Sequence, residues 1–145
     1  MREKLIVASL VLVALTGCKK QVPSDIVDKS MKSALRHAPV TAAAMCGGTG
    51  VKGMSVSSVL VTERGKEANT GTVHVKGTPL FGKDAAATCE GDLEYAYSYD
   101  SRKVSRNTTR TTWYLKHLKL KAVQTKGVTF KSVDEDVNDD DDDGK

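Results

Sequence analysis

The hydrophobic pattern of this 145-residue chain changes its period near Met54, and that change limits the folds that the chain can adopt. Before this point, apolar residues recur at helical spacing, at Val27, Met31, Ala34, Leu35 and Ala38. This spacing places them on one face of an α-helix. After it, apolar and polar residues alternate, which is the period of β-strands with one buried face. The sequence therefore predicts a helix followed by several strands.

Residue alternation and turn residues give the expected bounds of the strands. They are residues 54–63, 68–76, 88–100 and 109–123, with a last short strand at 127–133. Gly77-Thr78-Pro79 is expected to stop the second strand, and residues 101–107 are expected to form a polar turn. In the fourth strand the apolar side changes near Lys116 and His117, where a β-bulge would restore one continuous core face.

This order of elements predicts one α+β domain over residues 24–133. An N-terminal amphipathic helix would pack on a curved antiparallel sheet of four to five strands. The order is similar to that of cystatin-like folds. That similarity rests on element order alone and implies nothing about function.

The first residues of the chain have the composition of a signal peptide. Arg2 and Lys4 precede an uncharged run from Leu5 to Leu15. As a helix this run would be about 16 Å long, against about 30 Å for the core of a bilayer. It is therefore too short to span a membrane comfortably and fits an export signal. The alternative is an ordinary buried N-terminal helix.

The run ends in Leu15-Thr16-Gly17-Cys18, which resembles the lipobox of bacterial lipoproteins. The resemblance implies that residues 1–17 are removed and that Cys18 receives a diacylglycerol and a further acyl chain such as palmitate. Residues 18–23 would then be a lipidated tether. In many lipoproteins an Asp after the cysteine retains the protein in the inner membrane. Lys19 departs from that signal, so the resemblance implies the outer membrane, facing the periplasm.

Two more cysteines, Cys46 and Cys89, remain if Cys18 is lipidated. Compartments outside the cytoplasm are oxidising, so these two are expected to form a disulfide. The alternative is a free, reactive Cys46 beside Gly47-Gly48.

The net charge of +4 hides a strong asymmetry. Residues 18–133 carry 19 Lys and Arg against 9 Asp and Glu, whereas residues 134–145 carry 8 acids and one Lys. The last segment cannot bury a core and is predicted to be a disordered acidic tail. We hypothesise that it screens the basic body.

Basic residues concentrate in the second half of the chain. Those expected to bind anions are Arg102, Lys103, Arg106, Arg110, Lys116, Lys119 and Lys121. Such a patch attracts polyanions, and near a membrane it could contact anionic headgroups. Nucleic acid is not an expected partner in this compartment. The alternative is a plain solvated basic surface.

Aromatic residues gather on two neighbouring strands, at Tyr95, Tyr97, Tyr99, Trp113 and Tyr114. We expect them to belong to the core, with a groove for a sugar or peptide as the alternative.

No catalytic or metal-binding set can be assembled. The chain has three histidines, His37, His74 and His117, without the spacing of a zinc site. Acidic residues alternate along one strand, at Glu90, Asp92 and Glu94, as on a solvated face. We therefore expect no cofactor, no metal and no enzymatic activity. The sequence favours a membrane-anchored binding or assembly module of the cell envelope, for a protein partner or an anionic envelope ligand.

Overall fold

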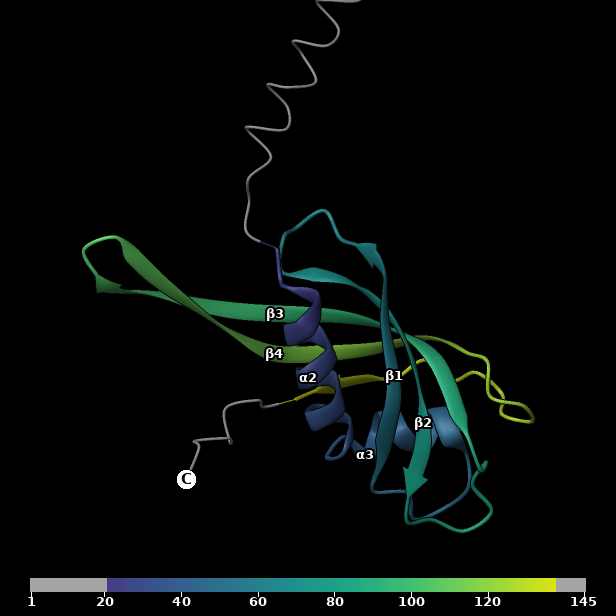
Figure 1. Ribbon diagram of the computed structural model, residues 1–145. Coiled ribbons are helices and arrows are strands. Elements are labelled where there is room, and N and C mark those ends of the chain that lie inside the picture. Colours follow the sequence, from purple (N-terminus) through teal and green to yellow (C-terminus); the bar gives the residue numbers. More distant parts are fainter. Residues whose placement is uncertain (1–20, 138–145) are drawn as a thin grey trace, which may run out of the picture.

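The computed structural model describes residues 21–137, which form two helices and one antiparallel sheet (Figure 1). The helices are α2 (Ser24–Leu35) and α3 (Pro39–Cys46). The strands are β1 (Gly53–Arg64), β2 (Thr70–Leu80), β3 (Cys89–Ser105), β4 (Thr108–Val123) and β5 (Asp134–Asp136). They are ordered β1-β2-β3-β4-β5 in an open sheet, which confirms the predicted α+β class. The predicted signal peptide and Cys18 lie outside the described residues.

One face of the sheet is apolar, and the two helices cover it. Val27, Met31 and Leu35 of α2 are fully buried, because they share the face of the helix that contacts the sheet. In Figure 1, α2 lies in the angle between β1 and the long β3–β4 hairpin. The inward residues of the middle strands belong to the same core, at Val73, Val75, Leu93, Tyr95, Tyr97, Leu115, Leu118 and Leu120. Each fully buried Leu or Met contributes about 2–3 kcal/mol, so this layer is the main source of stability.

A β-bulge in β4 keeps that face continuous. The pairing of β3 with β4 skips Lys116, so Leu115 and Leu118 both point into the core. The sequence prediction of a bulge near Lys116 and His117 is confirmed.

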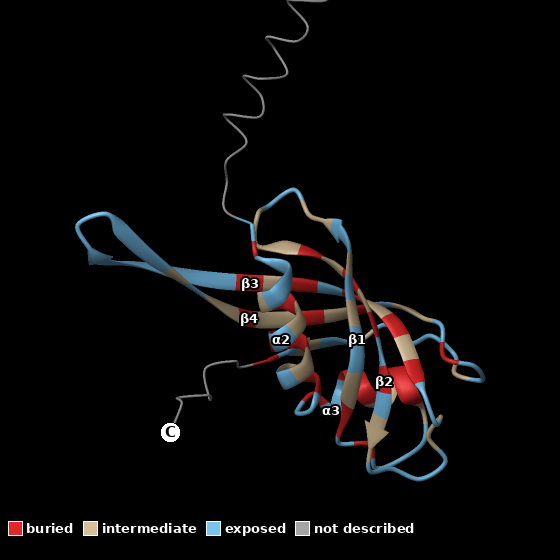
Figure 2. Ribbon diagram, in the orientation of Figure 1, coloured by how far each residue is buried: buried red, intermediate tan, exposed pale blue. Residues whose placement is uncertain are grey.

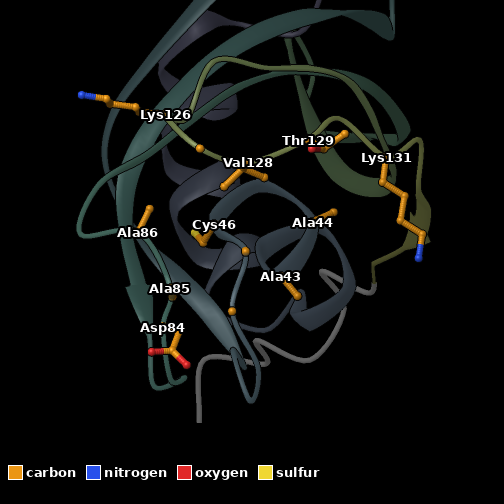
Figure 3. Close-up of a pocket in the computed structure, with 13 residues that line it drawn as sticks. Ala43, Ala44, Cys46, Asp84, Ala85, Ala86, Lys126, Val128, Thr129 and Lys131 are labelled. Carbon is orange, nitrogen blue, oxygen red and sulfur yellow. The ribbon is translucent and has the colours of Figure 1, made fainter.

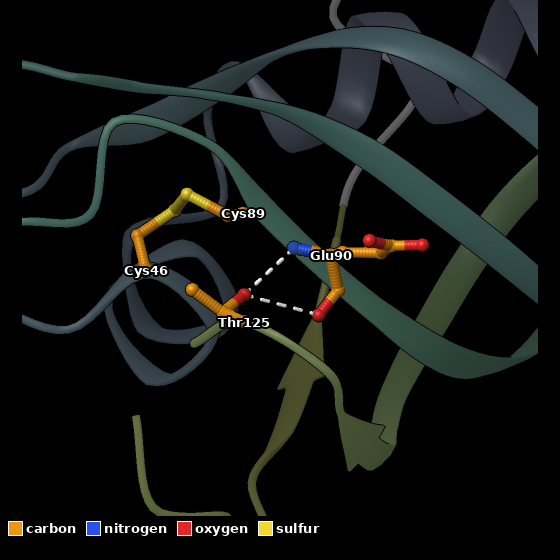
Figure 4. The surroundings of a disulfide bond; sticks show 4 residues. All are labelled: Cys46, Cys89, Glu90 and Thr125. Carbon is orange, nitrogen blue, oxygen red and sulfur yellow. Dashed lines mark hydrogen bonds between the residues drawn. A yellow bond between two sulfur atoms is a disulfide. The ribbon is translucent and has the colours of Figure 1, made fainter. Parts of the chain in front are cut away.

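The predicted disulfide is also confirmed. Cys46 at the end of α3 is bonded to Cys89 at the start of β3, with Cα atoms 5.0 Å apart (Figure 4). Beside it, the buried Thr125 hydroxyl accepts from the Glu90 N–H at 2.7 Å and donates to the Glu90 carbonyl at 3.1 Å. The disulfide therefore ties α3 to β3, the middle strand of the sheet, beside these two hydrogen bonds.

The second strand does not stop at Gly77-Thr78-Pro79, as the sequence suggested. β2 continues to Leu80, with Pro79 opposite Met54 of β1. β3 begins opposite Gly77, so beyond that point β2 has only β1 beside it. A proline without an N–H is tolerated where one side of a strand is unpaired.

The expected turn over residues 101–107 is also wrong. Strand β3 runs to Ser105 and β4 starts at Thr108, which leaves only Arg106 and Asn107 as the turn. The segment has no alternation of apolar and polar residues because neither of its faces is covered by the helices.

The end of the domain differs from the prediction as well. Residues 127–133 form no strand, and Asp134–Asp136, placed by the sequence in a disordered tail, form β5 against β4. The Glu135 carboxylate accepts from the Thr41 N–H at 2.9 Å and the Thr41 hydroxyl at 2.8 Å, near the N-terminus of α3. Backbone pairing and this helix cap order the acidic residues. Residues 138–145 lie outside the described part of the chain.

Replacing both bonded cysteines, as Cys46→Ala with Cys89→Ala, should lower the free energy of unfolding by about 2–4 kcal/mol. The loss of the cross-link gives the unfolded chain more freedom and releases α3 from β3. Urea unfolding followed by circular dichroism measures the change. A reductant should bring the unaltered protein to the stability of the variant and leave the variant unchanged; equal stabilities without reductant would contradict the prediction.

Candidate functional site

The outer part of the β3–β4 hairpin, residues 98–113, projects from the body as a two-stranded ribbon that we call the basic arm. β2 pairs with β3 only as far as Ala96, and β5 pairs with β4 only as far as His117. Within the described residues, the two strands of the basic arm therefore form ladder pairs only with each other. Figure 2 shows the arm almost wholly exposed, unlike the body from which it extends.

Four of the seven predicted anion-binding residues lie on the basic arm: Arg102, Lys103, Arg106 and Arg110. The only acidic residue of the arm is Asp100. Arg102 lies directly opposite Arg110 across the ladder, and like charges in that position repel. None of the four cations forms an ion pair with another residue in the range 21–137. Anion binding would relieve this repulsion.

The basic arm also carries apolar side chains. At its root the Tyr99 and Trp113 rings pack together, with centroids 5.1 Å apart, and Tyr99 is 58% exposed. Near its tip, Val104 is 50% exposed. Tyr95 and Tyr97, by contrast, are buried in the core. The predicted aromatic cluster is thus divided between the core and the arm.

The other three predicted anion-binding residues, Lys116, Lys119 and Lys121, lie on the body. Lys121 forms an ion pair with Glu94 at 3.5 Å. Lys119 lies between Glu94 of β3 and Asp134 of β5 in the sheet register, and Lys116 lies over the Tyr114 ring. The seven residues therefore do not form one patch, and the uncompensated charge is on the arm.

A histidine on the outer face of the sheet is held between two carboxylates. His74 Nδ1 is 2.7 Å from Asp92 Oδ1, and its Nε2 is 2.6 Å from Glu90 Oε2. The hydrogen bonds to Asp92 and to Glu90 outweigh partial burial and raise the pKa of His74. The protonated ring donates to both carboxylates and links β2 to β3.

His117 repeats this arrangement between β4 and β5. Its Nδ1 is 3.0 Å from Asp136 Oδ1 and its Nε2 is 3.2 Å from Asp134 Oδ1. The hydrogen bonds to Asp136 and to Asp134 raise the pKa of His117. Sequence reasoning did not find either cluster, because each depends on strand register. The signal that the sequence offered was the alternation of Glu90, Asp92 and Glu94 on β3, two of which hold His74.

A shallow cleft lies between α3 and residues 126–131, next to the disulfide (Figure 3). Its volume is about 430 Å³. Small apolar residues line much of it, including Ala43, Ala85 and Val128, while Lys126 and Lys131 point away from it. The cleft thus has little polar chemistry with which to fix a ligand.

Over residues 21–137, no cluster of His, Cys, Asp and Glu is arranged to hold a metal ion. Neither α2 nor α3 has the length and apolar composition needed to cross a bilayer. Comparison with protein-family models, curated proteins and solved structures found no match to this chain.

The His74 cluster predicts a pH-dependent stability. Folding raises the pKa of His74. Its contribution to the free energy of unfolding is therefore complete below about pH 6.5, the ordinary pKa of histidine. It is lost as the pH rises through the raised value. His74→Gln should therefore lower the free energy of unfolding by about 1 kcal/mol at pH 6, with the difference shrinking at alkaline pH.

Urea unfolding between about pH 6 and pH 9 measures this dependence. His37→Gln, at an exposed position after α2, is the matched control and should leave the profile unchanged. A His74→Gln deficit that does not vary with pH would contradict the assignment.

Proposed function

We propose that this chain is a lipid-anchored protein of a bacterial cell envelope, whose domain is a non-enzymatic binding module. The basic arm is its ligand-binding element, and its ligands are anionic envelope components, either polysaccharides or lipid headgroups. Cys18 carries the anchor, and the domain faces the periplasm from the outer membrane.

The anchor is supported by the sequence and by the pairing of the cysteines. The charged start, the short apolar run and Leu15-Thr16-Gly17-Cys18 are the features of a lipoprotein signal. The disulfide joins Cys46 and Cys89. Of the three cysteines in the chain, Cys18 is the one that this disulfide does not use. A disulfide also fits an oxidising compartment.

The observation that carries the binding proposal is the pair Arg102 and Arg110, opposite each other on an exposed ribbon. An isolated two-stranded ribbon is marginally stable in water, and cross-strand repulsion weakens it further. A sheet that extends so far from its core, with its charge uncompensated, is suited to binding a polyanion. Guanidinium groups can also bind phosphate or carboxylate with two parallel hydrogen bonds.

Arg102→Gln with Arg110→Gln should weaken binding to a soluble polyanion such as heparin by roughly 30-fold at about 0.1 M salt, since each basic residue contributes about 1 kcal/mol. The strands should remain paired because the repulsion is removed. Isothermal titration calorimetry with the mature protein measures the affinity.

Lys29→Gln with Lys83→Gln removes the same charge from two exposed positions on the body and serves as the control. Its affinity should fall by less than about threefold, because at about 0.1 M salt the screening length is about 10 Å and distant charges contribute little. Equal losses in both double variants would indicate that only net charge matters and would refute the role of the arm.

Cys18→Ser tests the anchor independently. The variant should accumulate as a precursor that keeps residues 1–17, because the serine hydroxyl does not replace the lipidated thiol. Mass spectrometry of the protein from the native host, with detergent partitioning, measures both cleavage and acylation. A normally processed Cys18→Ser protein, or an unaltered protein with a free Cys18 thiol, would exclude the lipoprotein assignment.

A further inference from the structure

The root of the basic arm lies beside the start of the folded domain. The N–H of Val22 donates to the carbonyl of Ala68 at 3.4 Å, and the next residue, Asn69, is bonded to the arm root. The N–H of Tyr97 donates to the Asn69 carbonyl at 2.8 Å, and the Asn69 side-chain amide donates to the Tyr97 carbonyl. The turn that contains Ala68 and Asn69 thus connects Val22, near the start of the domain, to β3, from which the arm extends.

This proximity sets the reach of the arm. If Cys18 holds the chain at a membrane, the three residue steps from Cys18 to Gln21 span at most about 10 Å. The β3 part of the basic arm, residues 98–105, is about 25 Å long. A surface that holds Cys18 would therefore lie within reach of the arm.

The composition of the basic arm matches a membrane interface. Arg102, Arg106 and Arg110 present guanidinium groups that bind phosphate. Tyr99 and Trp113 form an aromatic pair at the root, and such residues are favoured at the boundary between headgroups and acyl chains. The half-exposed Val104 adds an apolar contact near the tip.

We propose that the basic arm binds the phosphate headgroups of the same bilayer that holds the lipid anchor. The inference rests on the proposed function and names the ligand among those it allows. The acyl chains and the arm then act as two linked membrane contacts. The acyl chains raise the effective concentration of headgroups around the basic arm. The domain is held in one orientation on the membrane, with the arm along the surface.

The single tryptophan of the chain, Trp113, reports on the arm directly. The lipidated mature protein is reconstituted into vesicles of phosphatidylcholine, alone or mixed with phosphatidylglycerol. Brominated acyl chains should quench Trp113 at least about threefold more in the anionic vesicles. The difference should disappear at about 1 M salt, where the screening length is about 3 Å.

The variant Arg102→Gln with Arg110→Gln should lose this difference, while Lys29→Gln with Lys83→Gln should keep it. A second probe, Val104→Trp in a Trp113→Phe background, reports on the tip of the arm and should be quenched in the same vesicles.

Quenching that is equal in neutral and anionic vesicles for both probes would overturn the inference. If heparin still binds the arm under those conditions, the ligand is a soluble polyanion such as a polysaccharide, and the proposed function stands. If heparin binding is also absent, the proposed function fails with it.

Discussion

The fold depends on covering one apolar face of a twisted sheet with a limited length of helix. Among residues 21–137 only α2 and α3 perform this task, and their buried side chains meet the inward residues of β2, β3 and β4. The Ser30 hydroxyl of α2 is hydrogen-bonded to the Tyr97 hydroxyl, at the last position where β3 is buried. Beyond that position the strands continue without a helix over them.

The basic arm follows from this mismatch between strand length and helix cover. Beyond Tyr97 on β3 and before Leu115 on β4, every residue except Thr111, Trp113 and Tyr114 is exposed. No core can form there, so charged side chains can occupy these positions without being buried. The same covering requirement explains the bulge at Lys116, which keeps Leu115 and Leu118 inward while the strand passes under α2.

How far the sequence predicts the structure depends on whether a feature arises from burial or from pairing. The helix face containing Val27 and Met31 and the bulge near Lys116 follow from apolar spacing, and both are present. The disulfide follows from the number of cysteines and the inferred compartment. The outer part of β3 was not predicted, because residues 101–105 show no alternation of apolar and polar side chains. Strand β5 was missed because its partners, Lys119 and Thr41, are distant in sequence.

The candidate site was predicted in part for the same reason. Charge could be counted along the chain, so Arg102 and Arg110 were recognised, but their position opposite each other needs the hairpin register. The lysines of the body could not be separated from them without knowing that Glu94 and Asp134 lie beside Lys119. The cluster around His74 was not predicted, because its two carboxylate partners lie on the next strand.

The contact between Glu135 and Thr41 has a consequence for how the domain responds to proteolysis. Val137, directly after β5, is buried, so an enzyme that removes it cuts into the folded domain. Digestion past that point would take away the anion that neutralises the first turn of α3, an eight-residue helix whose other end holds Cys46. The stability of α3 is therefore coupled to an intact β5, and loss of that strand would weaken the helix that carries Cys46.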